Sequence, residues 1–378
     1  MNRGNAGINS SLCLCVSDAV MSLLKLDIHA VRNIQKASIF PSPTINFIVG
    51  DNASGKSSLI EAIFILGRAK SFRCSSIKSV VNFTESHLVV AAQTVQTNGS
   101  HVQLGVQLDG KVIEIHINQQ AKQKRSDLAY ALPLQLIHPK SYELLDAGAQ
   151  IRREFLDWGV FNSEPHFLIS WHRFKKALSQ RNALLKTRRL EQLNVWDKEL
   201  VTYGTMVNNY RQQYLKKLKP VFIDIVEKFL TIEGIELKLL PGWDIAKDFS
   251  QVLIDDQDKD LRYGFTHSGP HRGDVQLLIN NRLARDFISR GQLKLLVMSL
   301  KLAQLQLLSH EQSQAGCLLI DDFSAELDII NRAKVLRYLS DIACQAFITA
   351  TEIIDFGDIS QIKNYKMFHV EHGVIKPV

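Results

Sequence analysis

The segment GDNASGKS, residues 50–57, restricts the possible folds of this chain more than any other feature. Its fixed positions match the phosphate-binding pattern G-x-x-x-x-G-K-[ST]. The apolar run INFIV before it predicts a strand, and SSLIEAIFIL after it predicts a helix. Glycines allow backbone angles that turn successive N–H groups towards phosphate oxygens, and the positive end of the following helix adds attraction. The segment therefore predicts a P-loop between a strand and a helix, which places the chain in the α/β class.

The residues of this loop have expected parts in nucleotide binding. The Lys56 ammonium is expected to contact the β- and γ-phosphates and to assist catalysis, and the Ser57 hydroxyl is expected to ligate Mg²⁺. The other candidate contacts are Gly50, Asp51, Asn52, Ala53, Ser54, Gly55 and Ser58. ATP and Mg²⁺ are the cofactors that this loop predicts.

A second acidic segment, GCLLIDDFSAELD at residues 316–328, supplies the carboxylate that a P-loop site needs for its metal. Asp321 follows a short apolar run and is expected at the end of a strand, where it can associate with Mg²⁺. Asp322 comes next, at a position where a general base for water could lie.

Both ends of the chain have α/β patterns, and a helical segment separates them. Alternating strand patterns include HVQLGVQLDGKVIEIHIN, with Asp109-Gly110 as a hairpin turn, and a three-four spacing of apolar residues predicts long helices over 165–231. The break at Thr187–Asn194 predicts an antiparallel helical pair, and Pro220 is expected to end or kink its second helix. We expect a P-loop head domain assembled from both chain ends, with an inserted mainly helical lobe. The predicted division is a disordered extension at 1–20, the head at 21–135, the helical lobe at 136–265 and the rest of the head at 266–378.

A third motif distinguishes between P-loop families. Residues Ser289-Arg290-Gly291-Gln292 resemble the S-G-G-Q signature of ABC-type ATPases, and the seven-residue step from Asp321 to Asp328 resembles that family's D-E-x-x-x-x-L-D run. In that family two nucleotide domains meet head to tail, and the signature of one caps the γ-phosphate on the P-loop of the other. The resemblance implies that Ser289 to Gln292 contact nucleotide held by a second chain, and that ATP joins two chains.

From Met21 onward the chain resembles the RecF family of ABC-type ATPases. The likeness also rests on RNIQ (32–35), RREFLDW (152–158), QRNALL (180–185), WDKEL (196–200) and SGPHRGD (268–274). It implies a weak, DNA-stimulated ATPase that forms an ATP-dependent homodimer on DNA of any sequence, whether single-stranded, duplex or gapped. It also implies action with RecO and RecR in loading RecA during gap repair and replication-fork maintenance, and a part in SOS induction. Two alternatives stay open: a nucleotide-gated clamp with negligible hydrolysis, and an SMC-like structural head, against which the short insertion argues.

The same resemblance assigns further site residues and shows some departures. It implies nucleotide contacts by Arg32 and Asn33, and it makes Gln135 the Q-loop glutamine that senses Mg²⁺-nucleotide, with a plain loop amide as the alternative. Arg290 replaces a signature glycine, Asp322 replaces the usual, longer glutamate, and Thr351 lies where the family has a histidine. Slow hydrolysis is the expected consequence.

The helical segment is the expected DNA surface. Residues 151–233 hold 15 Lys and Arg against 9 Asp and Glu, a balance of 15 − 9 = +6, close to the +7 of the whole chain. The densest run contains no acid and predicts phosphate contacts by Arg173, Lys175, Lys176, Arg181, Lys186, Arg188 and Arg189. An ordinary basic surface is the alternative. For Arg152 and Arg153 we favour ion pairs at the lobe junction over DNA contact, and SGPHRGD could contact nucleotide, contact DNA or shape the lobe.

Composition and the remaining motifs mainly exclude other classes. The chain is 46% hydrophobic and 22% charged, as in ordinary soluble proteins, and no apolar stretch approaches the ~20 residues of a membrane span, so we expect a cytoplasmic protein. The five cysteines are scattered and are predicted to be free thiols. Gly269 and Pro270 prevent the helix that would make His267 and His271 a zinc pair.

Overall fold

The computed structural model describes residues 21–378 except 110–111, 123, 313–315 and 343. Its central sheet has the order β15-β14-β3-β13-β12-β8, and β15 alone runs antiparallel to its neighbour. The strands are β3 (Ile45–Val49), β8 (Leu134–Ile137), β12 (Cys317–Ile320), β13 (Gln345–Ala350), β14 (Tyr365–Glu371) and β15 (Val374–Pro377). Because β3 comes from the N-terminal half and β12 to β15 from the C-terminal end, the head is assembled from both ends of the chain, and the predicted fold class is confirmed.

A second, antiparallel sheet covers the helix that follows the P-loop. Its strands, in the order β2-β1-β4-β5-β6-β7, are β1 (Ser22–Val31), β2 (Ile34–Ile39), β4 (His87–Val95), β5 (His101–Asp109), β6 (Val112–Ile117) and β7 (Gln120–Lys122). Helix α1 (Lys56–Arg68) shares one apolar cluster with this sheet and with the central sheet, and α2 (Arg125–Ala131) contributes to the same cluster. The predicted hairpin is confirmed by the pairing of Asp109 with Val112, while its Gly110 lies outside the described residues.

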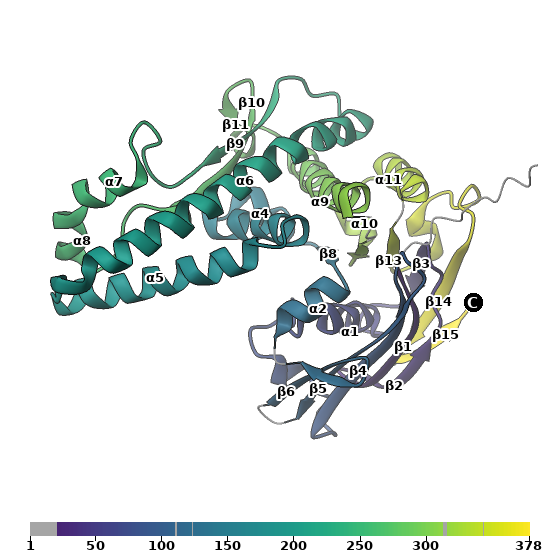
Figure 1. Cartoon of the computed structure of the whole chain (residues 1–378). Helices are drawn as coiled ribbons and strands as arrows, with labels where there is room; N and C mark the ends of the chain where they lie inside the picture. Colours follow the sequence, from purple (N-terminus) through teal and green to yellow (C-terminus); the bar gives the residue numbers. More distant parts are fainter. Residues whose placement is uncertain (1–20, 110–111, 123, 313–315, 343) are drawn as a thin grey trace, which may run out of the picture.

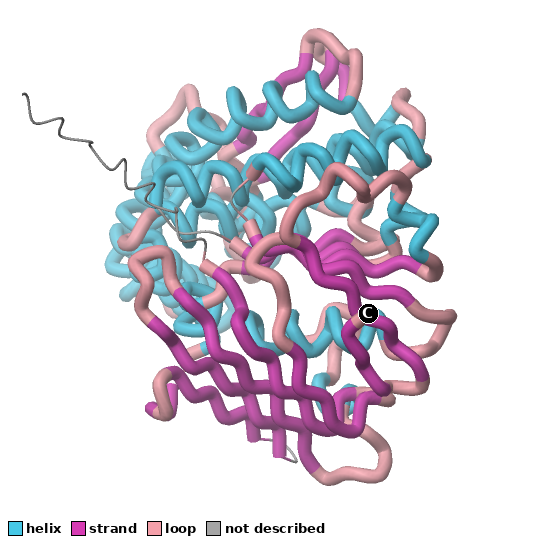
Figure 2. Tube along the Cα trace, turned by 90° about the vertical axis from the view of Figure 1, so that its right-hand side faces the viewer, coloured by secondary structure: helices cyan, strands magenta, loops and turns pink. Residues whose placement is uncertain are grey.

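The helical lobe is built on the antiparallel pair predicted by the sequence. The short α3 (Glu143–Asp146) and α4 (Ala149–Ser163) precede α5 (Phe167–Thr187) and α6 (Leu193–Phe229), which lie side by side (Figure 1). The C-terminal part of α6 continues beyond α5 towards the head, and Figure 2 shows most helices on one side of the molecule and the antiparallel sheet on the other. The apolar stripes of α5 and α6 are buried against each other because their three-four spacing keeps one face of each helix non-polar.

Pro220 does not end α6, so that alternative of the prediction is wrong. The helix is assigned without interruption from Leu193 to Phe229 with Pro220 inside it. A proline removes one backbone hydrogen bond from a helix, but Leu218, Phe222 and Ile225 on either side are fully buried. Tertiary packing therefore holds this part of the helix in place.

A small third sheet moves the expected lobe boundary. Strands β9 (Ile235–Leu240), β10 (Asp274–Ile279) and β11 (Arg282–Leu283) pair antiparallel in the order β11-β10-β9, and α7 (Phe249–Asp255) and α8 (Gln257–Tyr263) lie between the first two in sequence. The prediction placed 266–283 in the head, but the pairing of β10 with β9 attaches this segment to the lobe. The pairing of residues far apart in sequence was not visible in the local patterns.

Three helices connect the lobe to the strand ends that carry the acidic motif. They are α9 (Arg290–Gln312), α10 (Phe323–Glu326) and α11 (Ile329–Asp341), and the short 3-10 helix η5 (Ile353–Phe356) follows β13. The buried face of α9 shares one apolar cluster with α6 and with the central sheet. None of the helices in the described ranges is long and apolar enough to cross a membrane. Cys74, Cys317 and Cys344 are free thiols, and Cys13 and Cys15 lie outside the described residues.

Candidate nucleotide site and nucleic-acid surface

The P-loop connects β3 to α1, as the sequence predicted, and its first glycine, Gly50, lies against the backbone of a neighbouring strand. Gly50 has φ +152°, and a Cβ added there would lie 2.2 Å from the carbonyl oxygen of Val370 in β14. The N–H of Gly373 donates to the carbonyl of Ser54 at 2.7 Å, so the β14–β15 turn also supports the loop. The loop is thereby held open as a cradle of backbone groups.

Lys56 is the first residue of α1, and its side chain folds back over the loop. Its Nζ donates to the carbonyls of Gly50 at 2.6 Å and Asp51 at 2.8 Å. Burial lowers the pKa of Lys56, and the carboxylates of Asp322, Asp321, Asp51 and Asp355 oppose this shift. Its ammonium is thus placed over a loop whose buried Ser54 hydroxyl has no hydrogen-bond partner among the described residues. This arrangement fits an anionic phosphate group.

Two of the three predicted metal ligands, Ser57 and Asp321, come from opposite ends of the chain and lie in contact. The Ser57 hydroxyl donates to Oδ1 of Asp321 at 2.9 Å, and the Thr349 hydroxyl donates to the same oxygen at 3.0 Å. Burial raises the pKa of Asp321, and the hydrogen bonds from Ser57 and Thr349 oppose it. A hydroxyl and a carboxylate at this separation are hard oxygen ligands beside the P-loop, so the residues fit Mg²⁺ bound together with phosphate.

Asp322 has an unusual backbone conformation directly after the end of β12. Its φ of 61° is left-handed, its side chain is exposed, and its N–H donates to the Thr349 hydroxyl at 2.8 Å. Non-glycine residues in this region often lie at functional sites. The sequence analysis missed Thr349 and named Thr351, whose backbone carbonyl instead accepts from the N–H of Gly50. The parallel register of Ile320 with Ile348, once known, places Asp321 beside Thr349.

Gln135 is not placed as a Q-loop glutamine, and that prediction is wrong. It lies within β8, is only 6% exposed, and its Nε2 donates to Oε1 of Gln304 in α9 at 2.7 Å. His138 instead follows the carboxyl end of β8, where the N–H of Asp321 donates to the carbonyl of Ile137. Burial lowers the pKa of His138 to about 4, with help from the charges of Lys301 and Lys140. In the sequence, the one signal for His138 is its position directly after the apolar segment LQLI.

Arg32 and Asn33 brace the P-loop from the antiparallel sheet. Asn33 donates from Nδ2 to the carbonyl of Ser54 at 2.9 Å and accepts from the Ser58 hydroxyl at 2.9 Å. Arg32 forms two hydrogen bonds to the buried carboxylate of Glu61, at 2.9 and 3.0 Å. Their polar groups are used within the protein, so these residues position the loop rather than present free groups to a nucleotide.

The signature residues begin α9 with a capping box. Gln292 N–H donates to the Ser289 hydroxyl at 3.2 Å, and Ser289 N–H donates to Oε1 of Gln292 at 3.1 Å. Ser289, Arg290 and Gly291 are exposed, whereas the Gln292 side-chain oxygen is occupied by the cap. Arg290 and Gly291 line an open cavity of about 600 Å³ together with Ser324 and Ala325 of α10 and with Leu327 and Asp328 in the turn after it.

Two cations tie α10 and the turn after it to their neighbours. Lys294 in α9 donates to the carbonyl of Ala325 at 2.7 Å. Arg332 in α11 donates to the carbonyls of Leu327 at 2.8 Å, Ser324 at 3.2 Å and Asp355 at 2.6 Å. The signature helix, the turn after Asp322 and η5 are therefore braced together within one chain.

The predicted DNA residues divide into an exposed group and one buried residue. The exposed side chains on α5 and just beyond it are Arg173, Lys175, Lys176, Lys186, Arg188 and Arg189, and Arg173 lies 3.9 Å from Glu199. Arg181 is fully buried and pairs with Asp197 at 2.6 Å and Asp260 at 2.5 Å. The prediction that Arg181 contacts DNA is therefore wrong, because its guanidinium neutralises acids inside the lobe.

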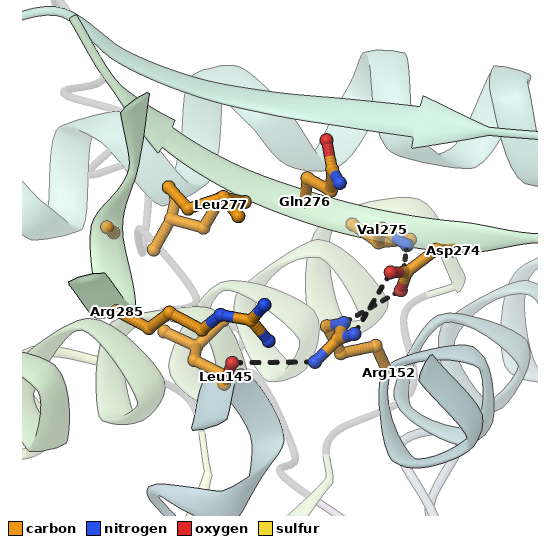
Figure 3. Close-up of a pocket in the computed structure, with 9 residues that line it drawn as sticks. Leu145, Arg152, Asp274, Val275, Gln276, Leu277 and Arg285 are labelled. Atoms are coloured by element: carbon orange, nitrogen blue, oxygen red, sulfur yellow. Dashed lines mark hydrogen bonds and ion pairs between the residues drawn. The ribbon is translucent and has the colours of Figure 1, made fainter. Parts of the chain in front are cut away.

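The junction between α4 and β10 is an ion pair, as favoured from the sequence. Arg152 donates from Nε and Nη2 to the Asp274 carboxylate at 2.7 and 2.9 Å and also contacts the carbonyl of Leu145 (Figure 3). Arg153 donates to the carbonyl of Gly273 at 2.7 Å. Within SGPHRGD, Ser268 donates to Asp256 at 2.5 Å, and Pro270 accepts from Arg211 at 2.7 Å. These contacts make the segment part of the packing of the lobe.

Comparisons with known proteins match the whole of this architecture. A family model described as the RecF/RecN/SMC N terminal domain matches residues 22–376. The chain is 39% identical over 360 residues to the DNA replication and repair protein RecF of Pseudomonas fluorescens (strain Pf0-1), covering 94% of this chain and 98% of that one. It is 38% identical over 359 residues to the RecF of Pseudomonas aeruginosa (strain LESB58), covering 94% and 97%.

Solved structures agree in fold. The recombination mediator protein RecF with ATP, from the RecFOR pathway, matches with a TM-score of 0.84 and 26% identity over 95% of this chain and 98% of that one. The Smc head domain from Pyrococcus furiosus matches with a TM-score of 0.57 and 16% identity over 95% and 96%, which is a likeness of fold.

Proposed function

We propose that this chain, which belongs to the RecF family of DNA replication and repair proteins, is an ATP-gated DNA-binding protein. In this proposal Mg²⁺-ATP binds at the P-loop of one copy and is capped by Ser289, Arg290 and Gly291 of a second copy, so that two heads close on DNA. Hydrolysis then removes the γ-phosphate that the cap holds, and the two copies separate.

One observation carries the proposal. The P-loop residues and the acidic motif come together at the carboxyl ends of the central strands, although Lys56 and Asp321 are 265 residues apart in sequence. The Ser57 hydroxyl lies 2.9 Å from the Asp321 carboxylate. The signature residues are exposed on a different element, the start of α9, and their cavity is lined by the turn after Asp322. In this proposal, the outer end of a triphosphate bound at the P-loop is therefore covered by the signature residues of a second copy. The solved RecF with ATP supports ATP as the ligand.

The chemistry needs few protein groups. Bound Mg²⁺ supplies charge neutralisation at the phosphates. Lys56 and the backbone N–H groups of the loop orient the phosphates, and the exposed Asp322 carboxylate accepts the proton of the attacking water. Asp322 is shorter than glutamate, and the Thr349 hydroxyl on the neighbouring strand already bonds to Asp321 and to the N–H of Asp322, so we propose that turnover is slow.

The partners follow from family membership and charge. A solved relative is described as a recombination mediator in the RecFOR pathway, so we propose RecO and RecR as partners, with RecA loading at gaps and SOS induction as the outcome. The exposed cations of α5 are the proposed contacts to DNA phosphates, without preference for sequence.

The mass of the protein in solution tests the proposal. Light scattering of Asp322→Asn with Mg²⁺-ATP is expected to give twice the mass found with ADP or without nucleotide, because the trapped triphosphate keeps the two copies joined. Single-turnover hydrolysis by this variant is expected to be at least about 100-fold slower than by wild type, as for loss of a general base. Equal residual rates would favour the clamp with negligible hydrolysis. A mass that ATP does not change would contradict the gating scheme.

Charge reversal on α5 tests the DNA surface. The pair Lys175→Glu and Lys176→Glu is expected to weaken binding to any DNA by about tenfold or more at moderate salt and to lower the slope of log affinity against log salt by about 2. The exposed pair Lys36→Glu and Lys363→Glu on the head changes the net charge equally and is the control. If both pairs reduce DNA affinity alike, the effect is one of overall charge and α5 is not the contact surface.

A further inference from the structure

The head exposes a set of large apolar side chains next to the acidic motif. Ile329 and Ile330, in the first turn of α11, are 61% and 69% exposed, and Ile353 and Ile354, in η5, are 50% and 73% exposed. We call these residues the isoleucine patch. Single exposed apolar residues are common, but several on neighbouring elements are typical of a surface that another molecule covers.

The two elements of the isoleucine patch are fixed to each other. Arg332, on the same turn of α11 as the first two isoleucines, donates to the carbonyl of Asp355 within η5 at 2.6 Å. Its Nε donates to the carbonyl of Leu327, immediately before α11, at 2.8 Å. The guanidinium is only 15% exposed, so both pairs of isoleucines are presented by one braced unit.

The isoleucine patch borders the nucleotide site on both of its elements. Ile329 directly follows Asp328, and Asp328 lines the cavity shared with Arg290. η5 follows β13, whose Thr349 bonds to Asp321, and the Asp355 carboxylate within η5 acts electrostatically on Lys56. A second molecule that covers this edge of the head would therefore lie close to the isoleucine patch.

We propose that the isoleucine patch is the apolar part of the face that contacts a second copy of this chain in the ATP-bound dimer. The inference rests on the proposed function, in which the second copy brings its signature residues over the P-loop edge. The exposed acids around the patch, Asp322, Asp328 and Glu352, are complementary in charge to the exposed Arg290 in the signature of that copy.

Two pairs of substitutions test the isoleucine patch. The first is Ile329→Asp with Ile330→Glu, which suits the first turn of a helix because acids interact favourably there. The second is Ile353→Ser with Ile354→Asp. In the Asp322→Asn background with Mg²⁺-ATP, each pair is expected to raise the dimer dissociation constant by at least about 100-fold, because four isoleucines per dimer lose their burial.

The readouts separate this inference from the proposed function. Nucleotide affinity of the monomer is expected to stay within about twofold of the parent for both pairs, and sedimentation velocity measures the dimer. Ile254→Asp, at a 63% exposed isoleucine of α7 on the lobe, is the matched control and is expected to dimerise normally. If the parent dimerises and both patch pairs dimerise equally well, the inference is overturned while the gating scheme stands. If the parent itself stays monomeric with ATP, both are overturned.

Discussion

Replacing Lys56 with alanine is expected to abolish ATP-dependent dimerisation and to reduce nucleotide affinity by about 100-fold or more. The Lys56 ammonium lies over the loop, 2.6 and 2.8 Å from the carbonyls of Gly50 and Asp51, where it can turn to the phosphates. A charge-assisted hydrogen bond is worth about 1.5–3 kcal/mol, and the ammonium is expected to make two. Without it, the repulsion between the triphosphate and the carboxylates of Asp321 and Asp322 is no longer offset.

Fluorescent ATP binding and light scattering measure the two effects of Lys56→Ala. The matched control is Lys70→Ala, at an exposed lysine just beyond the end of α1. It removes the same charge from the same region and is expected to leave binding and dimerisation unchanged. Dimers of Lys56→Ala at the ATP concentration that joins wild-type chains would contradict the assignment of this lysine.

Replacing Arg181 with alanine is expected to lower the free energy of unfolding by about 3–5 kcal/mol, as for a broken buried ion pair. The guanidinium is fully buried and bonds to Asp197, Asp260 and Thr266 at 2.6, 2.5 and 2.8 Å. The side chain of Asp260 is also fully buried, and among the described residues it would keep the two hydrogen bonds from His267. The free energy of unfolding falls because the variant leaves a buried carboxylate inside the lobe without its positive partner.

Urea denaturation followed by circular dichroism measures the loss in Arg181→Ala. Arg188→Ala, at an exposed arginine just after the same helix, is expected to change stability by less than about 0.5 kcal/mol. The two variants also separate packing from DNA binding, because only Arg188 is exposed to a phosphate. A loss of less than about 1 kcal/mol in Arg181→Ala would show that the ion pairs of the lobe are not maintained in solution.

Much of the nucleotide site could be predicted because its signals are local. The P-loop needs only eight consecutive residues between a strand and a helix, and Asp321 needs only a short apolar run before it. The capping box of Ser289 and Gln292 is equally local, since it spans one turn of α9. The division into a head from both chain ends and a helical insertion followed from periodicity alone.

The errors concern contacts between residues that are distant in sequence. The sequence predicts Gln135 in a loop, whereas the structure buries it against Gln304, which lies 169 positions away in sequence. The sequence predicts Arg181 as a surface cation, whereas the structure buries it against Asp260, which lies 79 positions away in sequence. Thr349 became visible only through the register of two parallel strands, and Pro220 was tolerated because of packing. Composition and periodicity do not determine such pairings, so the burial of a charged or amide side chain could not be foreseen.

A mixing experiment tests most directly that the triphosphate is held between two copies. Lys56→Ala and Ser289→Ala are each expected to hydrolyse ATP very slowly, since each lacks one half of every site. A mixed dimer contains one site in which the intact P-loop of the Ser289→Ala chain faces the intact signature of the Lys56→Ala chain. Equal mixing is therefore expected to restore hydrolysis to at most about half of the wild-type rate, because each mixed dimer has one intact site of two. A mixture no more active than the two separate variants would contradict the account.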